Sequence, residues 1–263
     1  MTVTHVRTRQ EEARLRARVA AQLALLGTAL ARALRADDPT AGRLVDTRQQ
    51  DVEDWLQTVG AVLIQDTYQR LTVRVWDSLV QLATDDATQT SADIAALTGT
   101  ALVPLAPARI REIVATTLFP TPQRPGDQSA TLGTWWERQA DRLKMQLHDL
   151  LLVGVTQGIS LADLVDQVVG TEDRGFADGL VATAQEAASG LLRTAVTNTL
   201  AETRSVLAAA NPDAVQAIQH TSVLDGKTSL ICLGRDGLRY TADTHEPIGH
   251  TVPYLGGIPY HFN

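Results

Sequence analysis

The stretch AVLIQDTYQRLTVRVWDSLVQLATDDATQ, from Ala61 to Gln89, decides the fold class because it contains neither proline nor glycine. Apolar side chains recur in it at steps of three and four residues, at Tyr68, Leu71, Val75, Leu79 and Leu82. That spacing brings them to one face of an α-helix, so the stretch predicts a long amphipathic helix. The same stripe begins upstream, at Val52, Leu56, Val59 and Leu63.

The N-terminal segment predicts a second long helix. Its apolar stripe consists of Leu15, Val19, Leu23, Leu26, Leu30 and Leu34. This stripe stops at Asp37-Asp38-Pro39, because proline breaks a helix. Two long helices joined by a short break predict a helical hairpin over residues 1–85. Aromatic residues make up only 4% of the chain, so bulky packing partners are scarce. We therefore expect the apolar stripes of this hairpin not to be fully buried by the rest of the chain.

Shorter helices are expected next. Ser91 and Asp93 are typical of a helix start, and Gly99 is suited to end that helix. Pro107 suits the first turn of another helix, because its missing N–H would have no intrahelical partner there. The stretch Phe119–Ser129 contains three prolines and a glycine, so it predicts a loop.

Two more long helical segments are predicted in the second half of the chain. One runs from Trp135 to Val155, and Gly158 can adopt the positive φ that ends a helix. Ser160 is placed to cap the following helix, with Asp163 in its first turn. The last run extends from Phe176 to Ala210 and is rich in alanine, which permits close helix packing.

The character of the chain changes after Pro212. Residues 214–226 carry β-compatible side chains and end in an Asp225-Gly226 turn, and LICLGRDGLRY is predicted as a hairpin that turns at Asp236-Gly237. The sequence thus predicts a mainly α fold with a small C-terminal β module (α+β). We expect three regions: an N-terminal helical region over 1–120, a helical body over 130–212, and the β module with an irregular tail over 213–263.

This module is expected to pack against the helix that contains Arg193 to Leu207. The Pro/Gly-rich tail should fold back over the hairpin. His261 would then lie close to the Asp225 loop or to Cys232, helped by burial of Ile258 and Tyr260.

The charge is unevenly distributed. The whole chain carries −7, but residues 1–35 hold seven arginines and two glutamates, a net charge of +5. Such a basic arm could contact DNA or an acidic partner through Arg7, Arg9, Arg14, Arg16 and Arg18, although a solvated helix face carries the same pattern. No uninterrupted apolar run suggests a membrane span, and one cysteine gives no internal disulfide.

The sequence contains no common catalytic motif. It has no GxxxxGK[ST], GxGxxG, GxSxG or HExxH element, so we expect no enzymatic activity. Cys232, His245, His250 and His261 together offer the thiolate and imidazole ligands that zinc prefers. Their spacing matches no compact zinc motif, so a zinc site stays an alternative to a hydrogen-bonded clasp without cofactor.

Residues 221–240, TSVLDGKTSLICLGRDGLRY, and the later PYHFN resemble the C-terminal signature of phage Mu F-like minor head proteins, the phage head morphogenesis family. The matching positions are Asp225, Lys227, Thr228, Ser229, Cys232, Asp236, Gly237, Pro259, His261 and Asn263. The segments 154–168 and 191–207 also resemble the helical body of that family. Family members usually continue with Cys-Arg where this sequence has Asn263 as its last residue.

The resemblance implies a minor structural protein of the virion, located at the portal vertex of the capsid and assembled in the host cytoplasm. It implies a role in capsid assembly, DNA packaging or genome ejection, with the portal protein or the major capsid protein as partner. Asp225, Gly226, Thr228, Ser229, Cys232, Asp236, Gly237, His261 and Asn263 would form the turns and clasp of the module. Two alternatives remain: a DNA-binding virion protein, or the non-catalytic part of a longer enzyme or toxin.

Overall fold

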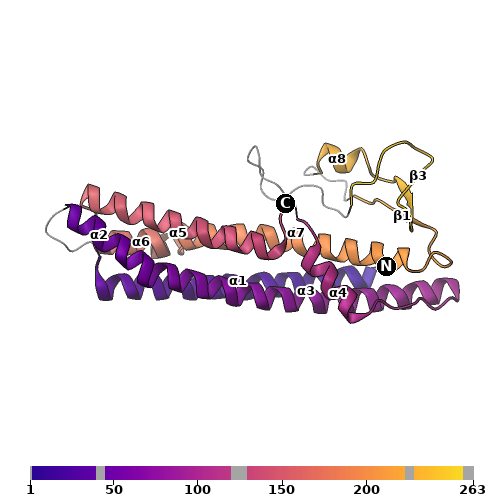
Figure 1. Ribbon diagram of the computed structural model, residues 1–263, viewed down its shortest axis with the longest axis horizontal. Coiled ribbons are helices and arrows are strands. Elements are labelled where there is room, and N and C mark those ends of the chain that lie inside the picture. The colour runs from indigo at the N-terminus through magenta and orange to yellow at the C-terminus, as the bar shows by residue number, and fades with distance from the viewer. Residues whose placement is uncertain (1, 40–44, 120–128, 223–227, 257–263) are drawn as a thin grey trace. The chain divides into compact units, whose positions relative to one another are not determined.

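The computed structural model describes residues 2–39, 45–119, 129–222 and 228–256, without the side chains of residues 2–7 and 45–48. The α-helices are α1 (Thr2–Asp37), α2 (Val45–Trp55), α3 (Ala61–Thr98), α4 (Pro107–Thr116), α5 (Leu132–Gln157), α6 (Leu161–Val169), α7 (Leu180–Ala209) and α8 (Leu230–Leu233). Two turns of other helix types are η1 (Leu56–Gly60) and η2 (Glu172–Arg174), and the strands are β1 (Ala217–Gln219), β2 (Arg239–Thr241) and β3 (Pro247–Ile248). Figure 1 shows this predominance of helices, which confirms the predicted mainly α fold with a small C-terminal β module.

The chain forms two compact units. Unit 1 comprises residues 1–12, 76–132 and 193–263, and unit 2 comprises residues 13–75 and 133–192. Helices α1, α3 and α7 each contribute residues to both units.

The long helix predicted around Ala61–Gln89 is present and extends to Thr98. The π-helical turn η1 connects α2 to α3. Gly60 lies in this turn, where a Cβ atom would come within 2.9 Å of the Trp55 ring. The prediction of a separate short helix at Ser91 is wrong, because the Ser91 hydroxyl donates to the Ala87 carbonyl inside α3 instead of capping a new helix. Gly99, with φ of +72°, ends the helix as predicted.

The expectation that the α1 stripe is not fully buried is wrong. Leu15, Leu23, Leu30 and Leu34 are all buried, and all belong to unit 2. In this unit α1 approaches α7 closely, since a Cβ at Gly27 would lie 2.9 Å from Val181, and Gln185 donates to the Ala20 carbonyl over 2.9 Å. Gly27 lets the two helices approach closely, and this approach helps to bury the stripe although few aromatic side chains are present.

A cluster of aromatic side chains lies in the core of unit 2. The rings of Trp135 and Trp136 on α5 meet edge to face with centroids 4.9 Å apart, and Trp136 lies 5.8 Å from Tyr68 on α3. Both tryptophans are almost completely buried. These contacts join α3 to α5, so the predicted stripes of both helices share one core.

The boundary between α5 and α6 agrees with the prediction in detail. Gly158 has φ of +67°, and the Ser160 hydroxyl accepts from the Asp163 N–H at the start of α6. The helix predicted to begin at Phe176, however, begins at Leu180. Residues 170–179 form a tight connection instead, in which Phe176 itself has φ of +61°.

The C-terminal module contains a small antiparallel sheet in the order β1-β2-β3. The prediction that Leu230–Leu233 is part of a hairpin is wrong, because these residues form α8. The Ser229 hydroxyl accepts from the Cys232 N–H and caps the helix, which overrides the β preference of the apolar side chains. The hairpin strands are instead β1 and β2, in a register that pairs Ile218 with Tyr240.

Candidate functional site

The signature residues within the described range gather around Ser222. The Ser222 N–H donates to an Asp236 carboxylate oxygen over 2.7 Å, and its hydroxyl donates to the Cys232 carbonyl over 2.9 Å. The hydroxyl also lies 3.1 Å from Nε2 of His220. Through these contacts Ser222 joins the segment after β1 to α8 and to the turn that follows it, so it braces the module internally.

Gly237 completes this arrangement. It has φ of +80°, and its N–H donates to the His220 carbonyl over 2.9 Å, while the His220 N–H donates to the Leu238 carbonyl over 2.9 Å. A side chain at position 237 would be strained at this φ, so glycine suits the turn between α8 and β2. Thr228 is half-buried just before the Ser229 cap.

Other predicted members of the site cannot be placed in it. Asp225, Gly226, His261 and Asn263 lie outside the described residues, as do Ile258 and Tyr260. The predicted contact of His261 with the Asp225 loop or with Cys232 therefore stays a prediction.

The two histidines of the predicted cluster that the structure describes, His245 and His250, form hydrogen bonds with other groups of the protein. Nε2 of His250 lies 2.9 Å from the Arg239 carbonyl, and its Nδ1 accepts from the Val252 N–H over 3.2 Å. Nε2 of His245 lies 2.9 Å from the hydroxyl of Ser205 on α7. Among the described residues no three His, Cys, Asp or Glu side chains are placed to hold one metal ion.

The Ser205–His245 contact fastens the module to α7, as predicted for the segment Arg193 to Leu207. The His245 ring also stacks on Tyr254 with centroids 4.3 Å apart. Burial raises the pKa of the Tyr254 phenol, whereas a hydrogen bond with Ser205 acts in the opposite direction. A serine and a histidine at this distance resemble the nucleophile and base of a hydrolase. Ser205, however, is buried within α7, and its hydroxyl is also hydrogen-bonded to Tyr254. The geometry fits a clasp better than a reaction centre.

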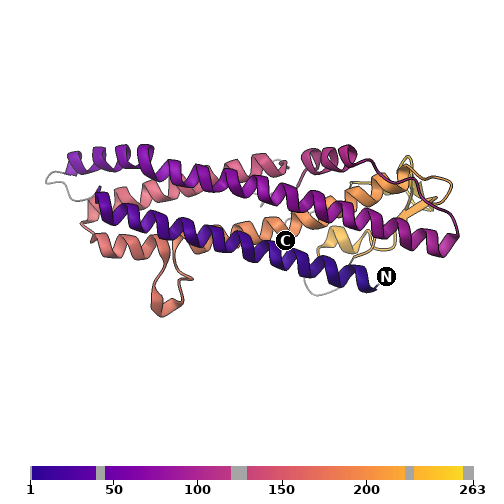
Figure 2. The same cartoon turned by 90° about the horizontal axis from the view of Figure 1, so that it is seen from below.

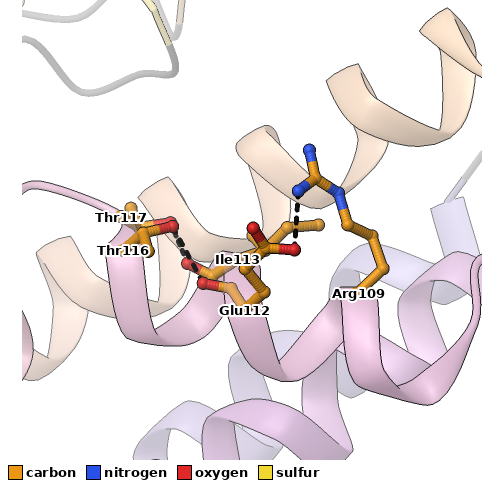
Figure 3. Close-up of polar contacts among 5 residues, drawn as sticks. All are labelled: Arg109, Glu112, Ile113, Thr116 and Thr117. Carbon is orange, nitrogen blue, oxygen red and sulfur yellow. Dashed lines mark hydrogen bonds and ion pairs between the residues drawn. The ribbon is translucent and has the colours of Figure 1, made fainter.

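A cavity of about 310 Å³ lies beside this clasp in unit 1. Its walls come from α4, from the Asn198, Glu202 and Val206 positions of α7, and from Leu255 and Gly256. Figure 3 shows the α4 wall: the Arg109 guanidinium donates to the Glu112 carboxylate over 2.7 Å, and the hydroxyls of Thr116 and Thr117 donate to carbonyls one turn earlier. These α4 groups are engaged within their own helix, so this wall offers no assembled acid–base pair to a substrate.

A second polar cluster anchors the end of α7 in unit 1. The Asn211 amide accepts from the Val103 N–H over 2.6 Å and donates to the carbonyls of Val103 and Leu207 over 3.1 and 2.8 Å. Arg204 donates two hydrogen bonds to the carboxylate of Asp86 on α3, over 2.7 and 2.5 Å. Ser222, His220, Ser205 and Asn211 were not singled out by the sequence, because isolated polar residues without a motif give no signal of their long-range partners.

The predicted basic arm is partly exposed. Arg9, Arg14 and Arg18 are exposed, whereas Arg16 is half-buried and donates to Ser189 on α7 over 3.5 Å. The side chain of Arg7 lies outside the described ones. Residues 8–37 of α1 have the length and hydropathy of a membrane span, as the one such helix in the described part of the chain. This is weak support for a membrane segment, since the core helix of a soluble protein has the same properties.

Comparisons with protein-family models, with curated proteins and with solved structures found no match to this chain.

Proposed function

We propose that this chain is a structural protein of a phage head: a minor head protein that associates with the portal vertex and acts in capsid assembly, DNA packaging or genome ejection. The observation that carries the proposal is the construction of the C-terminal module. At the signature positions, the side chains of Ser229 and Asp236 and the backbone of Cys232 take part in hydrogen bonds that brace the module internally. A braced module of this kind is suited to docking.

The docking surface would be the α8 face, which consists of Leu230, Ile231 and Leu233. These side chains are 84%, 51% and 53% exposed, although they are apolar and adjacent. Contiguous exposed apolar side chains on a rigid support are typical of protein interfaces. The portal protein or the major capsid protein would cover them in the virion.

A structural role without enzymatic activity is part of the proposal. Cys232 is buried, and its backbone N–H and carbonyl are both hydrogen-bonded within the module. Buried Ser205 and half-buried His245 pack against Tyr254 and serve as a clasp. The histidines likewise hold the module together without zinc, and neither role needs a cofactor.

The test is co-expression of the chain with the portal protein encoded in the same phage genome, followed by size-exclusion chromatography and electron microscopy. The wild-type chain should co-elute with the portal ring. Leu230→Asp combined with Leu233→Asp should abolish co-elution while the circular dichroism spectrum stays unchanged. The matched control is Val73→Asp, which places the same charge at an exposed apolar position of α3. A wild-type chain that elutes apart from the portal ring contradicts the proposal.

A second function, DNA binding by the N-terminal arm, is favoured by the exposure of Arg9, Arg14 and Arg18. Arg14 and Arg18 are four residues apart and therefore share a helix face. If the arm binds DNA, retention of the chain on duplex DNA should fall steeply with salt, because each phosphate contact releases counterions. Arg14→Gln with Arg18→Gln should reduce that salt dependence, whereas the same change at Arg109 and Arg111 on α4 should not.

A further inference from the structure

The connection between α6 and α7 is a tightly closed projection. Figure 2 shows it, coloured coral, standing out from the helices of unit 2. We call residues 170–179 the Phe176 loop. Glycine is required at both ends of its neck: a Cβ at Gly170 would lie 2.7 Å from the backbone of Phe176, and a Cβ at Gly179 would overlap the backbone nitrogen of Gly170. The two chain segments thus approach as closely as backbones can.

A polar clamp closes the neck of the loop. The N–H and the hydroxyl of Thr171 both donate to the Asp178 carboxylate, over 2.7 and 2.8 Å. The Phe176 N–H donates to the Thr171 carbonyl over 2.8 Å. These bonds fix the loop without any contribution from the Phe176 side chain.

Phe176 lies in this loop in a conformation that phenylalanine disfavours. Its φ of +61° belongs to the left-handed region, which glycine and asparagine adopt far more readily. The residue is 51% exposed, so a large part of the ring is available to a partner. Strained backbone with an exposed aromatic side chain points to a role in recognition, because a structural role alone favours glycine here.

The charges beside the ring indicate the kind of partner. Glu172 and Asp173 on η2 are exposed, whereas Arg174 lies 3.8 Å from Asp178 and offsets that carboxylate. The loop therefore presents one aromatic ring, two acidic side chains and the exposed guanidinium of Arg174, and with Asp178 its net charge is negative. Nucleic acid and anionic lipid would be repelled by these acids.

We propose that the Phe176 loop is a docking element that inserts its ring into an apolar pocket rimmed by arginine or lysine on a partner protein. Rigid aromatic anchors of this kind dominate the binding energy of many interfaces. The preformed loop would lose little conformational entropy on binding. The identity of the partner rests on the proposed function. That function makes the portal protein the partner, so the test uses portal protein as the probe.

The test measures binding of purified portal protein to the full-length chain by biolayer interferometry. Phe176→Asn removes the ring but suits the left-handed backbone, so the melting temperature should be unchanged or higher. The affinity should nevertheless fall roughly tenfold or more, as for a central aromatic anchor. Val73→Asn is the matched control, because it replaces an exposed apolar side chain of α3 in the same unit and should leave affinity unchanged.

The charge component is tested separately with Glu172→Lys and Asp173→Lys. These changes should slow association and weaken binding most at low salt. Wild-type binding that is insensitive to Phe176→Asn overturns the docking role of the loop but leaves the proposed function standing. A wild-type chain that binds no portal protein overturns both. A lower melting temperature of Phe176→Asn with unchanged affinity would assign Phe176 a structural role and likewise overturn the inference.

Discussion

At the scale of single residues, the two partners of the Asp86–Arg204 ion pair differ in their exposure to solvent. Asp86 is only 4% exposed, whereas the Arg204 side chain is 39% exposed. Removing one partner of a buried pair leaves the other charge to be solvated by its surroundings. Arg204 can turn to water when Asp86 is changed, but the Asp86 carboxylate cannot do so when Arg204 is changed.

We therefore expect Arg204→Met to destabilise unit 1 more than Asp86→Asn. The free energy of unfolding should fall by about 3–5 kcal/mol for Arg204→Met, because a buried carboxylate loses its partner. Asp86→Asn should cost about 1 kcal/mol, since the amide can still accept from the guanidinium. Urea denaturation of both variants measures the difference, and equal losses would show that burial does not set the cost.

His220 gives the module a dependence on pH. Burial lowers the pKa of its imidazole below the usual 6.5, and Arg235 acts in the same direction, whereas Asp236 opposes the change. The folded state thus binds fewer protons at His220 than the unfolded state does at mildly acidic pH, so stability rises with pH there. The contribution is fully present above pH 6.5 and is lost as the pH falls from 6.5 through the folded pKa.

His220→Gln keeps a hydrogen-bonding partner for Ser222 but does not titrate. The melting temperature of the wild type, relative to this variant, should therefore decrease between pH 7 and pH 5. The carboxylates elsewhere titrate equally in both proteins, so the difference isolates His220. Parallel curves over this range would mean that the imidazole is solvated in the folded state.

At the scale of elements, the sequence predicts best where the signal is local. Gly158 and Ser160 marked the boundary between α5 and α6 because cap chemistry depends on neighbouring residues. Leu230–Leu233 was mispredicted because a one-turn helix depends on the Ser229 cap and on the surrounding loop rather than on propensity. Phe176 was placed in a helix because nothing in its residue type indicates a positive φ. The Ser222 brace joins segments about ten residues apart and has no sequence motif.

Two glycines of α5 allow the effect of helix propensity on stability to be measured apart from the effect of packing. Gly133 has nothing within 4 Å of where a Cβ would stand, whereas a Cβ at Gly154 would overlap the Leu164 side chain on α6. Gly133→Ala should raise the free energy of unfolding by about 0.5 kcal/mol, because alanine restricts the unfolded chain. Gly154→Ala should lower it by about 1–3 kcal/mol through overpacking. Thermal unfolding compares the pair, and the same sign for both would contradict a close contact between α5 and α6.

At the scale of the whole molecule, the stripes were visible in the sequence but their partners were not. Periodicity identified Leu15, Leu23, Leu30 and Leu34 as one face of α1, and this face is buried. What covers it comes from helices more than 100 residues later, such as α7 at Val181 and Gln185. A single sequence carries no record of such long-range pairing.

The last prediction separates a core role of α1 from a membrane role. Leu30 is completely buried, whereas Leu25, five residues earlier on the same helix, is 61% exposed. Leu30→Ala should lower the free energy of unfolding by about 2–5 kcal/mol, because it removes transfer free energy and leaves a cavity. Leu25→Ala should change it by less than about 0.5 kcal/mol, as for a surface position. Urea denaturation of detergent-free protein measures both. A helix surrounded by lipid would expose both leucines to the same apolar medium, so similar effects of the two changes, with expression confined to the membrane fraction, would contradict the packing of α1 in unit 2.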